Sequence, residues 1–437
     1  MSTAKESISE KRSWRQGILP WIVCFSASLF FAYELLQMHV MNAISPMLIG
    51  DLGLSATEFG YLSATYLLAD VIFLLPAGMI LDRFSVRRVI LMALFLCILG
   101  TAGFCRAETF GFACLCHFLS GIGNAFCFLS CMMLIARWFP KEKQAFIVGL
   151  MITMGMLGGV MAQLPFSLLA ERFDWRQALL IDALIGVLIF ALIFIFVKDA
   201  PKENNILEDE STKKPEISFG EGLKRSILNV QNVCCGLYIG FMNLPLMIIS
   251  AVWGTLFLTQ VHHIPIINAS FIVSMICTGT IVGSPLVGWI SDKFARRRLP
   301  MVIGGLASLT VFIVIMIIPY PSEKLLASLF FLLGLVTSTQ VIGYPAITEN
   351  SPKELTGTSM GVAALIIMGM AALIQPLSGK ILDYCWDGTL SGGTPLYSLS
   401  DFMTAFLIFP IGFVIALLAL FKVKESQKKV NTSRYAS

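Results

Sequence analysis

Apolar segments of about 20 residues recur along this sequence from one end to the other, and no other feature constrains its fold as strongly. A helix of that length crosses a hydrocarbon core of ~30 Å, so each segment can span a bilayer. Twelve segments qualify, at 18–46, 57–81, 89–105, 109–136, 144–170, 177–197, 229–259, 266–291, 299–319, 325–347, 357–384 and 399–422. The pattern predicts a membrane protein with twelve spans.

Composition agrees with this interpretation. Hydrophobic residues make up 57% of the 437 residues and charged residues 13%, and the mean hydropathy is +0.81, which excludes a soluble globular domain. The segments are continuously apolar, without the alternation of barrel strands, and open sheet edges are not tolerated in lipid. The predicted fold class is therefore all-α.

Basic residues predict the orientation of the spans. If Met1 is cytoplasmic, most of the 31 Lys and Arg residues fall on the cytoplasmic side, as the positive-inside rule requires. We therefore expect a multi-pass membrane protein with both termini in the cytoplasm. The net charge of +4 follows from this bias and gives no reason to expect a nucleic-acid partner.

A charged segment divides the spans into two sets of six. Residues 198–228 carry two prolines and few large apolar side chains, which is typical of a linker. The expected organisation is a cytoplasmic tail at 1–17, a six-helix bundle at 18–197, a cytoplasmic linker at 198–228, a second six-helix bundle at 229–422 and a tail at 423–437.

The two halves share a repeated loop. "GMILDRFSVRR" (78–88) follows the second span, and "GWISDKFARRR" (288–298) follows the eighth, which is the second span of the latter half. Both combine glycine, three residues, aspartate, a basic residue, phenylalanine and an arginine cluster. An internal repeat in register with the hydropathy is typical of a transporter built from two related bundles.

These loops resemble the G-x-x-x-D-(R/K)-x-G-(R/K)-(R/K) pattern of the major facilitator superfamily. "WFPKEKQAFIVG", "FDWRQAL" and "GTSMG…QPLSGKILD" are similar to other parts of that family, and residues 31–85 resemble bacterial phagosomal nutrient transporter-type importers. The resemblance implies two six-helix bundles, alternating access and a location in a bacterial inner membrane. The sequence departs from it where Ser85 and Ala295 replace the loop glycine, and where His117 occupies a position at which the family often has arginine.

The repeated loops are candidate gates. A carboxylate at a cytoplasmic helix end can pair with arginines and face the positive N-terminus of a helix in the other bundle. The alternative is a solvated basic loop that sets topology. The gating candidates are Asp82, Arg83, Arg87, Arg88, Asp292, Arg296 and Arg297.

Carboxylates within the spans are candidate proton carriers. Glu34 and Asp70 are expected at similar depth, roughly 15–20 Å from the cytoplasmic ends, with Asp182 nearer the outer end of its span. A buried carboxylate is costly to ionise, so Glu34 and Asp70 are expected to couple protons to transport. The alternative is a structural pair hydrogen-bonded to tyrosines. The candidate substrate-binding residues are Tyr33, Gln37, Tyr66, His117, Asn124, Gln163, Asn243, Trp253, Gln340, Tyr344 and Gln375.

The expected function is secondary active transport of a small polar nutrient, an amino acid or a nucleoside, by proton-coupled symport. No Lys or Arg falls in the middle of a span, so we expect a substrate that is not a simple organic anion. Export of a drug or metabolite and a non-transporting membrane sensor are the alternatives. "GTSMG" (357–361) matches the G-x-S-x-G motif of serine hydrolases, but that motif requires a strand and a turn before its helix, and here it begins a membrane helix. We therefore expect that the protein is not an enzyme, and we expect no cofactor or metal. The expected partners are a small-molecule substrate, protons and the lipid bilayer, with the protein a monomer.

Overall fold

The computed structural model describes residues 17–139, 141–199, 219–294, 296–318, 321–352, 355–391 and 394–425. The predicted tails at 1–17 and 423–437 and the predicted linker at 198–228 lie largely outside these ranges. The N-terminal half contains α2 (Leu19–Leu52), α3 (Ala56–Arg83), α4 (Val86–Phe104), α5 (Phe110–Trp138), α6 (Lys141–Met161), α7 (Leu164–Phe173) and α8 (Trp175–Phe196).

The C-terminal half begins with a short helix and ends with a divided one. Its elements are α9 (Phe219–Leu228), α10 (Val230–Leu244), the π-helix η3 (Pro245–Trp253), α11 (Gly254–Val261), α12 (Ile266–Lys293), α13 (Arg298–Ile317), α14 (Glu323–Thr337), the 3-10 helix η4 (Ser338–Ile342), α15 (Gly343–Glu349), α16 (Thr356–Cys385), β1 (Leu390–Ser391), β2 (Thr394–Pro395), α17 (Leu399–Phe406) and α18 (Ile408–Leu420).

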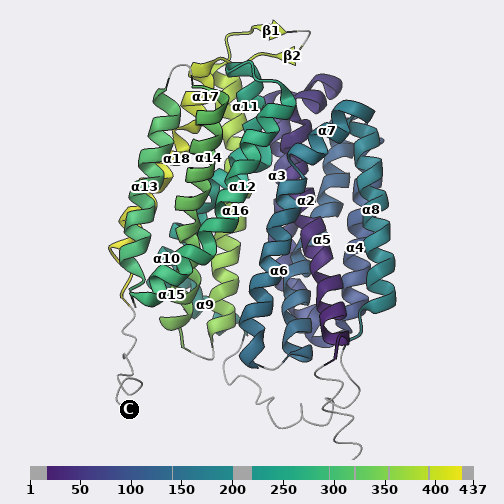
Figure 1. Cartoon of the computed structure of the whole chain (residues 1–437), viewed down its shortest axis with the longest axis vertical. Helices are drawn as coiled ribbons and strands as arrows, with labels where there is room; N and C mark the ends of the chain where they lie inside the picture. The colour runs from purple at the N-terminus through teal and green to yellow at the C-terminus, as the bar shows by residue number, and fades with distance from the viewer. Residues whose placement is uncertain are drawn as a thin grey trace, which may run out of the picture.

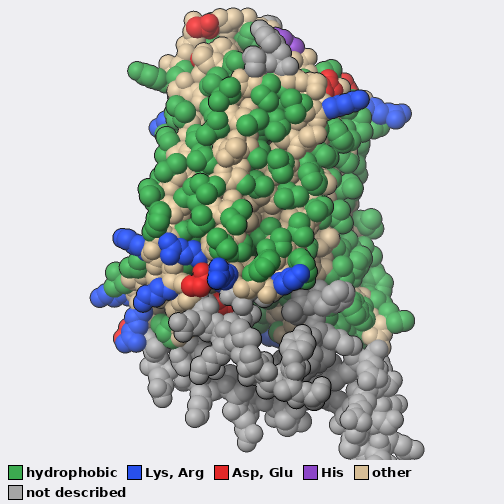
Figure 2. Space-filling model, turned by 60° about the vertical axis from the view of Figure 1, so that its left-hand side comes forward, with side chains coloured by type: hydrophobic (Ala, Val, Ile, Leu, Met, Phe, Trp, Pro, Cys, Tyr) green, Lys and Arg blue, Asp and Glu red, His purple; other side chains and the backbone are tan. Residues whose placement is uncertain are grey.

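The prediction of twelve spans is confirmed, because the described residues contain 12 helical segments long and apolar enough to cross a membrane. Hydrophobic side chains cover the middle of the face in Figure 2, and Lys and Arg gather toward its ends. Two features of the connections were not predicted. The last part of the predicted linker forms α9, and the segment between the last two spans contains an antiparallel hairpin that pairs Leu390 with Pro395.

Four spans predicted as single helices are divided. They are 144–170 (α6 and α7), 229–259 (α10, η3 and α11), 325–347 (α14, η4 and α15) and 399–422 (α17 and α18). Pro165 at the start of α7 and Pro245 at the start of η3 explain two of the breaks, because proline has no N–H for the helical hydrogen bond. A π-helix in a membrane span is a frequent mark of a functional site.

The two halves stand side by side, with α2 to α8 on one side and α9 to α18 on the other (Figure 1). We call the end that carries β1 and β2 the hairpin end, and the opposite end, where α9 lies, the linker end. α3 and α16 meet across the boundary. A Cβ on Gly60 would lie 2.9 Å from Pro376 Cα, and one on Gly379 would lie 3.1 Å from Thr57 Cα, so glycine permits this close approach.

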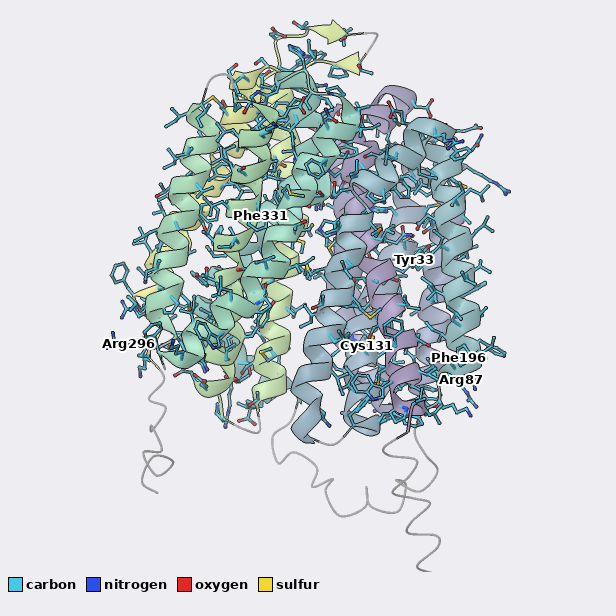
Figure 3. All side chains as sticks on the ribbon, in the orientation of Figure 1. Tyr33, Arg87, Cys131, Phe196, Arg296 and Phe331 are labelled. Carbon is cyan, nitrogen blue, oxygen red and sulfur yellow. The ribbon has the colours of Figure 1, made fainter. Side chains whose placement is uncertain are left out.

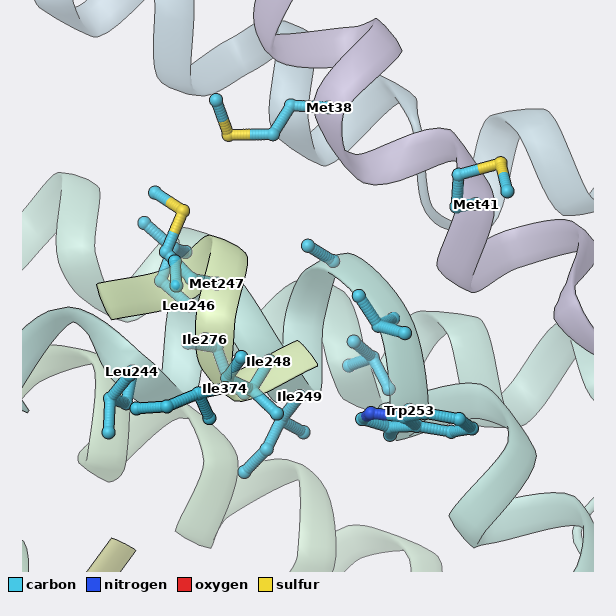
Figure 4. Packing of buried hydrophobic residues seen from close by; sticks show 14 of the residues in the cluster. Met38, Met41, Leu244, Leu246, Met247, Ile248, Ile249, Trp253, Ile276 and Ile374 are labelled. Atoms are coloured by element: carbon cyan, nitrogen blue, oxygen red, sulfur yellow. The ribbon is translucent and has the colours of Figure 1, made fainter. Parts of the chain in front are cut away.

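Apolar packing differs between the two ends. One hydrophobic cluster extends through both halves, and Figure 4 shows part of it, with Met38 and Met41 of α2 opposite Met247 and Trp253 of η3. A second cluster, which includes Val23 and Trp138, belongs to the N-terminal half alone. Toward the linker end the N-terminal half therefore has a core of its own, whereas toward the hairpin end it shares one with its neighbour.

Candidate functional site

Three carboxyl groups lie inside the N-terminal half. Glu34 on α2, Asp70 on α3 and Asp182 on α8 are 0%, 3% and 1% exposed. Gly123 on α5 makes room for the first of them, because a Cβ there would collide with Glu34 Oε1 and lie 3.2 Å from the carbonyl oxygen of Ala93. The helices thus enclose acidic side chains that the sequence places at mid-span.

Tyr66 ties Glu34 to α3. Its hydroxyl lies 2.7 Å from Glu34 Oε2 and 3.0 Å from the Glu34 backbone oxygen. The Tyr66 ring lies 5.3 Å from the ring of His117, measured between centroids. Glu34 Oε1 has no hydrogen-bond partner of ordinary geometry among the described residues, and its polar neighbour is the thiol of Cys97. The carboxyl group of Glu34 is therefore solvated by one good donor.

The other two acids also have neutral polar neighbours. Gln37 donates its amide N–H to Asp182 Oδ2, and the Tyr33 hydroxyl bonds to the Asp182 backbone oxygen at 3.3 Å. Figure 3 shows Tyr33 in the middle of the N-terminal half. The Asn124 side chain is a polar neighbour of Asp70. The hydrogen bonds of Gln37 and Tyr33 join α2 to α8, and Asn124 places an α5 side chain beside Asp70 of α3.

The electrostatic character of this acidic cluster follows from its partners. No described Lys or Arg forms an ion pair with Glu34, Asp70 or Asp182. An ionised carboxylate in such a place costs several kcal/mol unless it is compensated, whereas a protonated one carries no charge. The arrangement can therefore take up and release protons. Among the described residues, no group of three or more His, Cys, Asp or Glu side chains is placed to hold a metal ion.

A second polar network joins the two halves. Asn42 Nδ2 donates to Gln163 Oε1 at 2.7 Å and to Thr255 Oγ1 at 2.8 Å, and Asn42 Oδ1 accepts from the Thr255 backbone N–H at 2.8 Å. Gln163 Nε2 donates to the Ser250 backbone oxygen at 2.7 Å, and the hydroxyls of Ser167 and Ser270 are 2.5 Å apart. Because Gln163 lies in the break between α6 and α7, its amide is free to reach η3.

The remaining predicted binding residues belong to the C-terminal half. Trp253 Nε1 donates to Ser378 Oγ at 2.8 Å, and its ring meets Phe59 of α3 edge-on at 5.4 Å. Gln375 Nε2 donates to the Met247 backbone oxygen at 3.0 Å. Asn243 and Gln340 are buried and Tyr344 is partly buried, without a described side-chain hydrogen bond that links them to the other candidates.

The structure therefore divides the predicted binding set. Tyr33, Gln37, Tyr66, His117 and Asn124 surround the acidic cluster inside one half, whereas Gln163 and Trp253 lie at the boundary between the halves.

Sequence reasoning missed three polar residues at the boundary. His39 is 2% exposed, its Nδ1 lies 2.8 Å from the Leu35 oxygen, and its Nε2 has no partner among the described residues. Asn42 and Asp383 form hydrogen bonds across the halves. His39 and Asn42 share α2 with Glu34, so the search for polar residues in apolar spans that identified Glu34 would have identified them as well.

The gating candidates occupy the linker end. Arg87 donates its backbone N–H to Asp199 Oδ1 at 2.9 Å, and Arg297 Nη2 lies 2.9 Å from Glu349 Oε1. Arg83, Arg88 and Arg296 are exposed, and the side chains of Asp82 and Asp292 lie outside the described residues. Arg87 and Arg296 lie on opposite flanks of the molecule in Figure 3. The described partners of these arginines come from their own halves.

Comparisons with known proteins agree with this architecture. The family model described as Major Facilitator Superfamily matches residues 22–376. The membrane sensor protein UhpC of Escherichia coli is 23% identical over 94% of this chain and 95% of its own length. The probable galactarate/D-glucarate transporter GudP of Bacillus subtilis is 22% identical over 82% of this chain and 84% of its own.

Solved structures share the fold. A bacterial homologue of the human lysosomal transporter Spinster superposes with a TM-score of 0.76 at 17% identity, over 93% of this chain and 98% of that one. A D-xylose-proton symporter superposes with a TM-score of 0.73 at 15% identity, over 94% of this chain and 99% of that one.

Proposed function

Because the chain belongs to the Major Facilitator Superfamily, a family of transporters and not of enzymes, we propose that it imports a small polar nutrient by proton-coupled alternating access. The proposed substrate is an amino acid or a nucleoside, and the proposed site of action is a bacterial inner membrane, with both termini in the cytoplasm and the protein a monomer. The resemblance of residues 31–85 to phagosomal nutrient transporter-type importers favours import.

The environment of Glu34 is the observation that carries the proton-coupling proposal. Its carboxyl group is fully buried, it is hydrogen-bonded by Tyr66, and no described Lys or Arg pairs with it. Protonation removes a charge that the surrounding helices compensate poorly. Glu34 and Asp70 are the proposed proton carriers, and Asp182 is a third acid in the same half with Gln37 as its donor.

Substrate is proposed to bind between the halves. The boundary holds the Nε2 of His39, which has no partner among the described residues, and the side chains of Asn42, Gln163 and Trp253, whose polar groups are hydrogen-bonded within the protein in this closed structure. A midplane site between two bundles is the usual arrangement in transporters built from repeats. Asp82 and Asp292 remain the proposed gating residues at the linker end. The proposed substrate contacts from the C-terminal half are Asn243, Gln340, Tyr344 and Gln375.

The proposed substrate differs in charge from the substrates for which one relative is named. GudP is named for the organic acids galactarate and D-glucarate. In this chain Lys and Arg lie at or near the ends of the spans, with Lys380 close to the Cys385 end of α16. An anion at the midplane needs a positive partner, so a neutral, zwitterionic or cationic substrate fits better. An organic acid, the substrate class for which GudP is named, is the second candidate.

Two other functions are the alternatives to import. UhpC is named a membrane sensor, so binding without translocation is one alternative. Export is the other, since alternating access can run in either direction. A thermal-shift screen of the purified protein against amino acids, nucleosides, sugars and organic acids identifies a ligand, because a bound ligand raises the apparent stability.

Transport of that ligand into proteoliposomes then separates the functions. Accumulation driven by an inwardly directed proton gradient, and abolished by a protonophore, supports symport. Accumulation driven by the opposite gradient indicates exchange and export, and tight binding without any uptake indicates a sensor.

A further inference from the structure

Asp383 of α16 caps the start of α3, a helix of the other half. Its Oδ1 accepts a hydrogen bond from the Ala56 backbone N–H at 3.0 Å, and its Oδ2 accepts one from Thr57 N–H at 2.7 Å. The first N–H groups of a helix have no partner within that helix, and they carry its positive partial charge. A carboxylate is therefore a strong cap, and here the opposite half supplies it.

The rest of the cap comes from α3 itself. Ser55 Oγ accepts from the Glu58 N–H at 3.2 Å, and the Glu58 carboxylate accepts from the Ser55 N–H at 2.9 Å. This capping box leaves the N–H groups of Ala56 and Thr57 for an outside acceptor. Separation of the halves at the hairpin end would break the hydrogen bonds between these two N–H groups and the Asp383 carboxylate.

Tyr397 completes the contact from the segment beyond the hairpin. Its hydroxyl donates to Asp383 Oδ1 at 2.6 Å and accepts from the Ala56 N–H at 3.0 Å. Burial, followed by the hydrogen bond to Asp383, raises the pKa of Tyr397, so that the phenol remains a donor. The Tyr397 side chain is 1% exposed.

The sequence around Asp383 repeats that of the candidate gates around Asp82 and Asp292. "PLSGKILD" (376–383) matches "PLVGWISD" (285–292) at proline, leucine, glycine, isoleucine and aspartate. "GMILD" (78–82) has the same glycine, isoleucine and aspartate at the same spacing. Asp82 and Asp292 lie near the ends of their helices at the linker end, whereas Asp383 lies near the end of α16 at the hairpin end. The same helix ending thus occurs at both ends of the molecule.

We propose that Asp383 is the clasp of the hairpin end: it holds α3 and α16 together when that end is closed, and its release from Ala56 and Thr57 accompanies opening. This inference rests on the alternating access proposed above. Among the described residues, every hydrogen bond between the halves lies in the hairpin-end part of the molecule, from Asn42 to Asp383. The structure is therefore closed at the end where Asp383 acts.

Two native cysteines test the clasp. Cys277 is 1% exposed beside Ser250 and His39 at the boundary, and Cys97 is 0% exposed inside the N-terminal half. Opening of the hairpin end exposes Cys277, whereas general loosening exposes both. The protein in lipid nanodiscs is treated with a hydrophilic maleimide, and the labelled cysteines are identified by peptide mass spectrometry.

Asp383→Asn removes the negative charge. It also replaces one acceptor oxygen by an NH₂ group, which cannot accept a hydrogen bond from the N–H of Ala56 or Thr57. We expect labelling of Cys277 to become roughly tenfold faster, with Cys97 unchanged, because two charge-assisted hydrogen bonds are weakened. Tyr397→Phe, which keeps the carboxylate, should give a smaller change in the same direction. Asp387→Asn is the matched control, since Asp387 is exposed on the same segment and accepts a hydrogen bond from Thr389 N–H.

If Asp383→Asn and Tyr397→Phe accelerate the labelling of Cys97 and Cys277 equally, the clasp is overturned in favour of a structural role for Asp383. Unchanged Cys277 labelling in both variants would overturn it as well. The unmodified protein is labelled across a pH series. If its Cys277 reactivity varies with pH while the variants match it, the clasp fails and alternating access stands. If Cys277 is protected at every pH and in every variant, the proposed alternating access fails too.

Discussion

The hydroxyl of Tyr66 lies 2.7 Å from Glu34 Oε2, so a phenol on α3 solvates a fully buried carboxyl group on α2. The same hydroxyl lies 3.0 Å from the backbone oxygen of Glu34. We therefore expect Tyr66 to influence the proton transfer proposed for Glu34, because its phenol donates a hydrogen bond to that carboxyl group.

Tyr66→Phe is expected to slow proton-driven uptake. Without the phenol, the ionised form of Glu34 loses its good donor, and proton release becomes the slow step. Substrate counterflow, which needs no net proton movement, should change little. Tyr61→Phe serves as the control because Tyr61 is exposed on the same helix. Equal loss of both activities in Tyr66→Phe would contradict a role in coupling.

Gly121→Ala is expected to destabilise the N-terminal half. A Cβ at this position would lie 2.8 Å from Tyr66 Cα, so α3 and α5 would have to move apart. Such overpacking costs about 1–3 kcal/mol. Gly369→Ala is the control, since a Cβ there meets no heavy atom within 4 Å. Thermal unfolding in detergent compares the two, and equal melting temperatures would show that the close approach of α3 and α5 is not rigid.

Asn42→Ala is expected to weaken the closed hairpin end. The substitution removes hydrogen bonds to Gln163 and Thr255 and leaves those groups unpaired at the boundary, at a cost of about 1–3 kcal/mol. Labelling of Cys277 should accelerate. In the control Asn268→Ala, an exposed hydrogen bond to Glu323 is lost on α12, and Cys277 should stay protected. Similar rates of Cys277 labelling in the two variants would show that the Asn42 network does not hold the hairpin end closed.

Glu349→Gln is expected to lower stability by about 1–3 kcal/mol, because it removes the charge opposite the buried Arg297 guanidinium. Arg297 is 9% exposed and Glu349 is 21% exposed. The exposed pair Arg225–Glu221 on α9 provides the comparison, and Glu221→Gln should change stability by less than about 0.5 kcal/mol. Thermal unfolding measures both, and a larger effect at Glu221 would contradict the ranking by burial.

The helices were predictable from the sequence because hydropathy is a local property. Each span needs an apolar stretch of fixed length, and a window along the chain detects it. The breaks were not predicted, although Pro245 and Pro165 mark two of them. Whether a proline in a membrane span bends, widens or ends the helix depends on which neighbours satisfy the freed backbone groups.

The site was predictable in its residues but not in its pairings. Glu34 and Asp70 stand out as acids in apolar spans, yet nothing local indicates that Gln37 bonds to Asp182 or that Gln163 reaches Ser250. Asp383 lies at a helix end, where acidic residues are common. Its hydrogen bond with Ala56 therefore follows only from the three-dimensional packing of the two halves.

The role of Glu34 as proton carrier is the central claim, and one comparison tests it most directly. Glu34→Gln keeps the size and the hydrogen bond to Tyr66 but cannot exchange a proton. In proteoliposomes loaded with the ligand identified by thermal shift, we expect the variant to retain substrate counterflow and to lose accumulation driven by a pH gradient. Accumulation with unchanged pH dependence in Glu34→Gln would contradict the account and assign this carboxyl group a structural role.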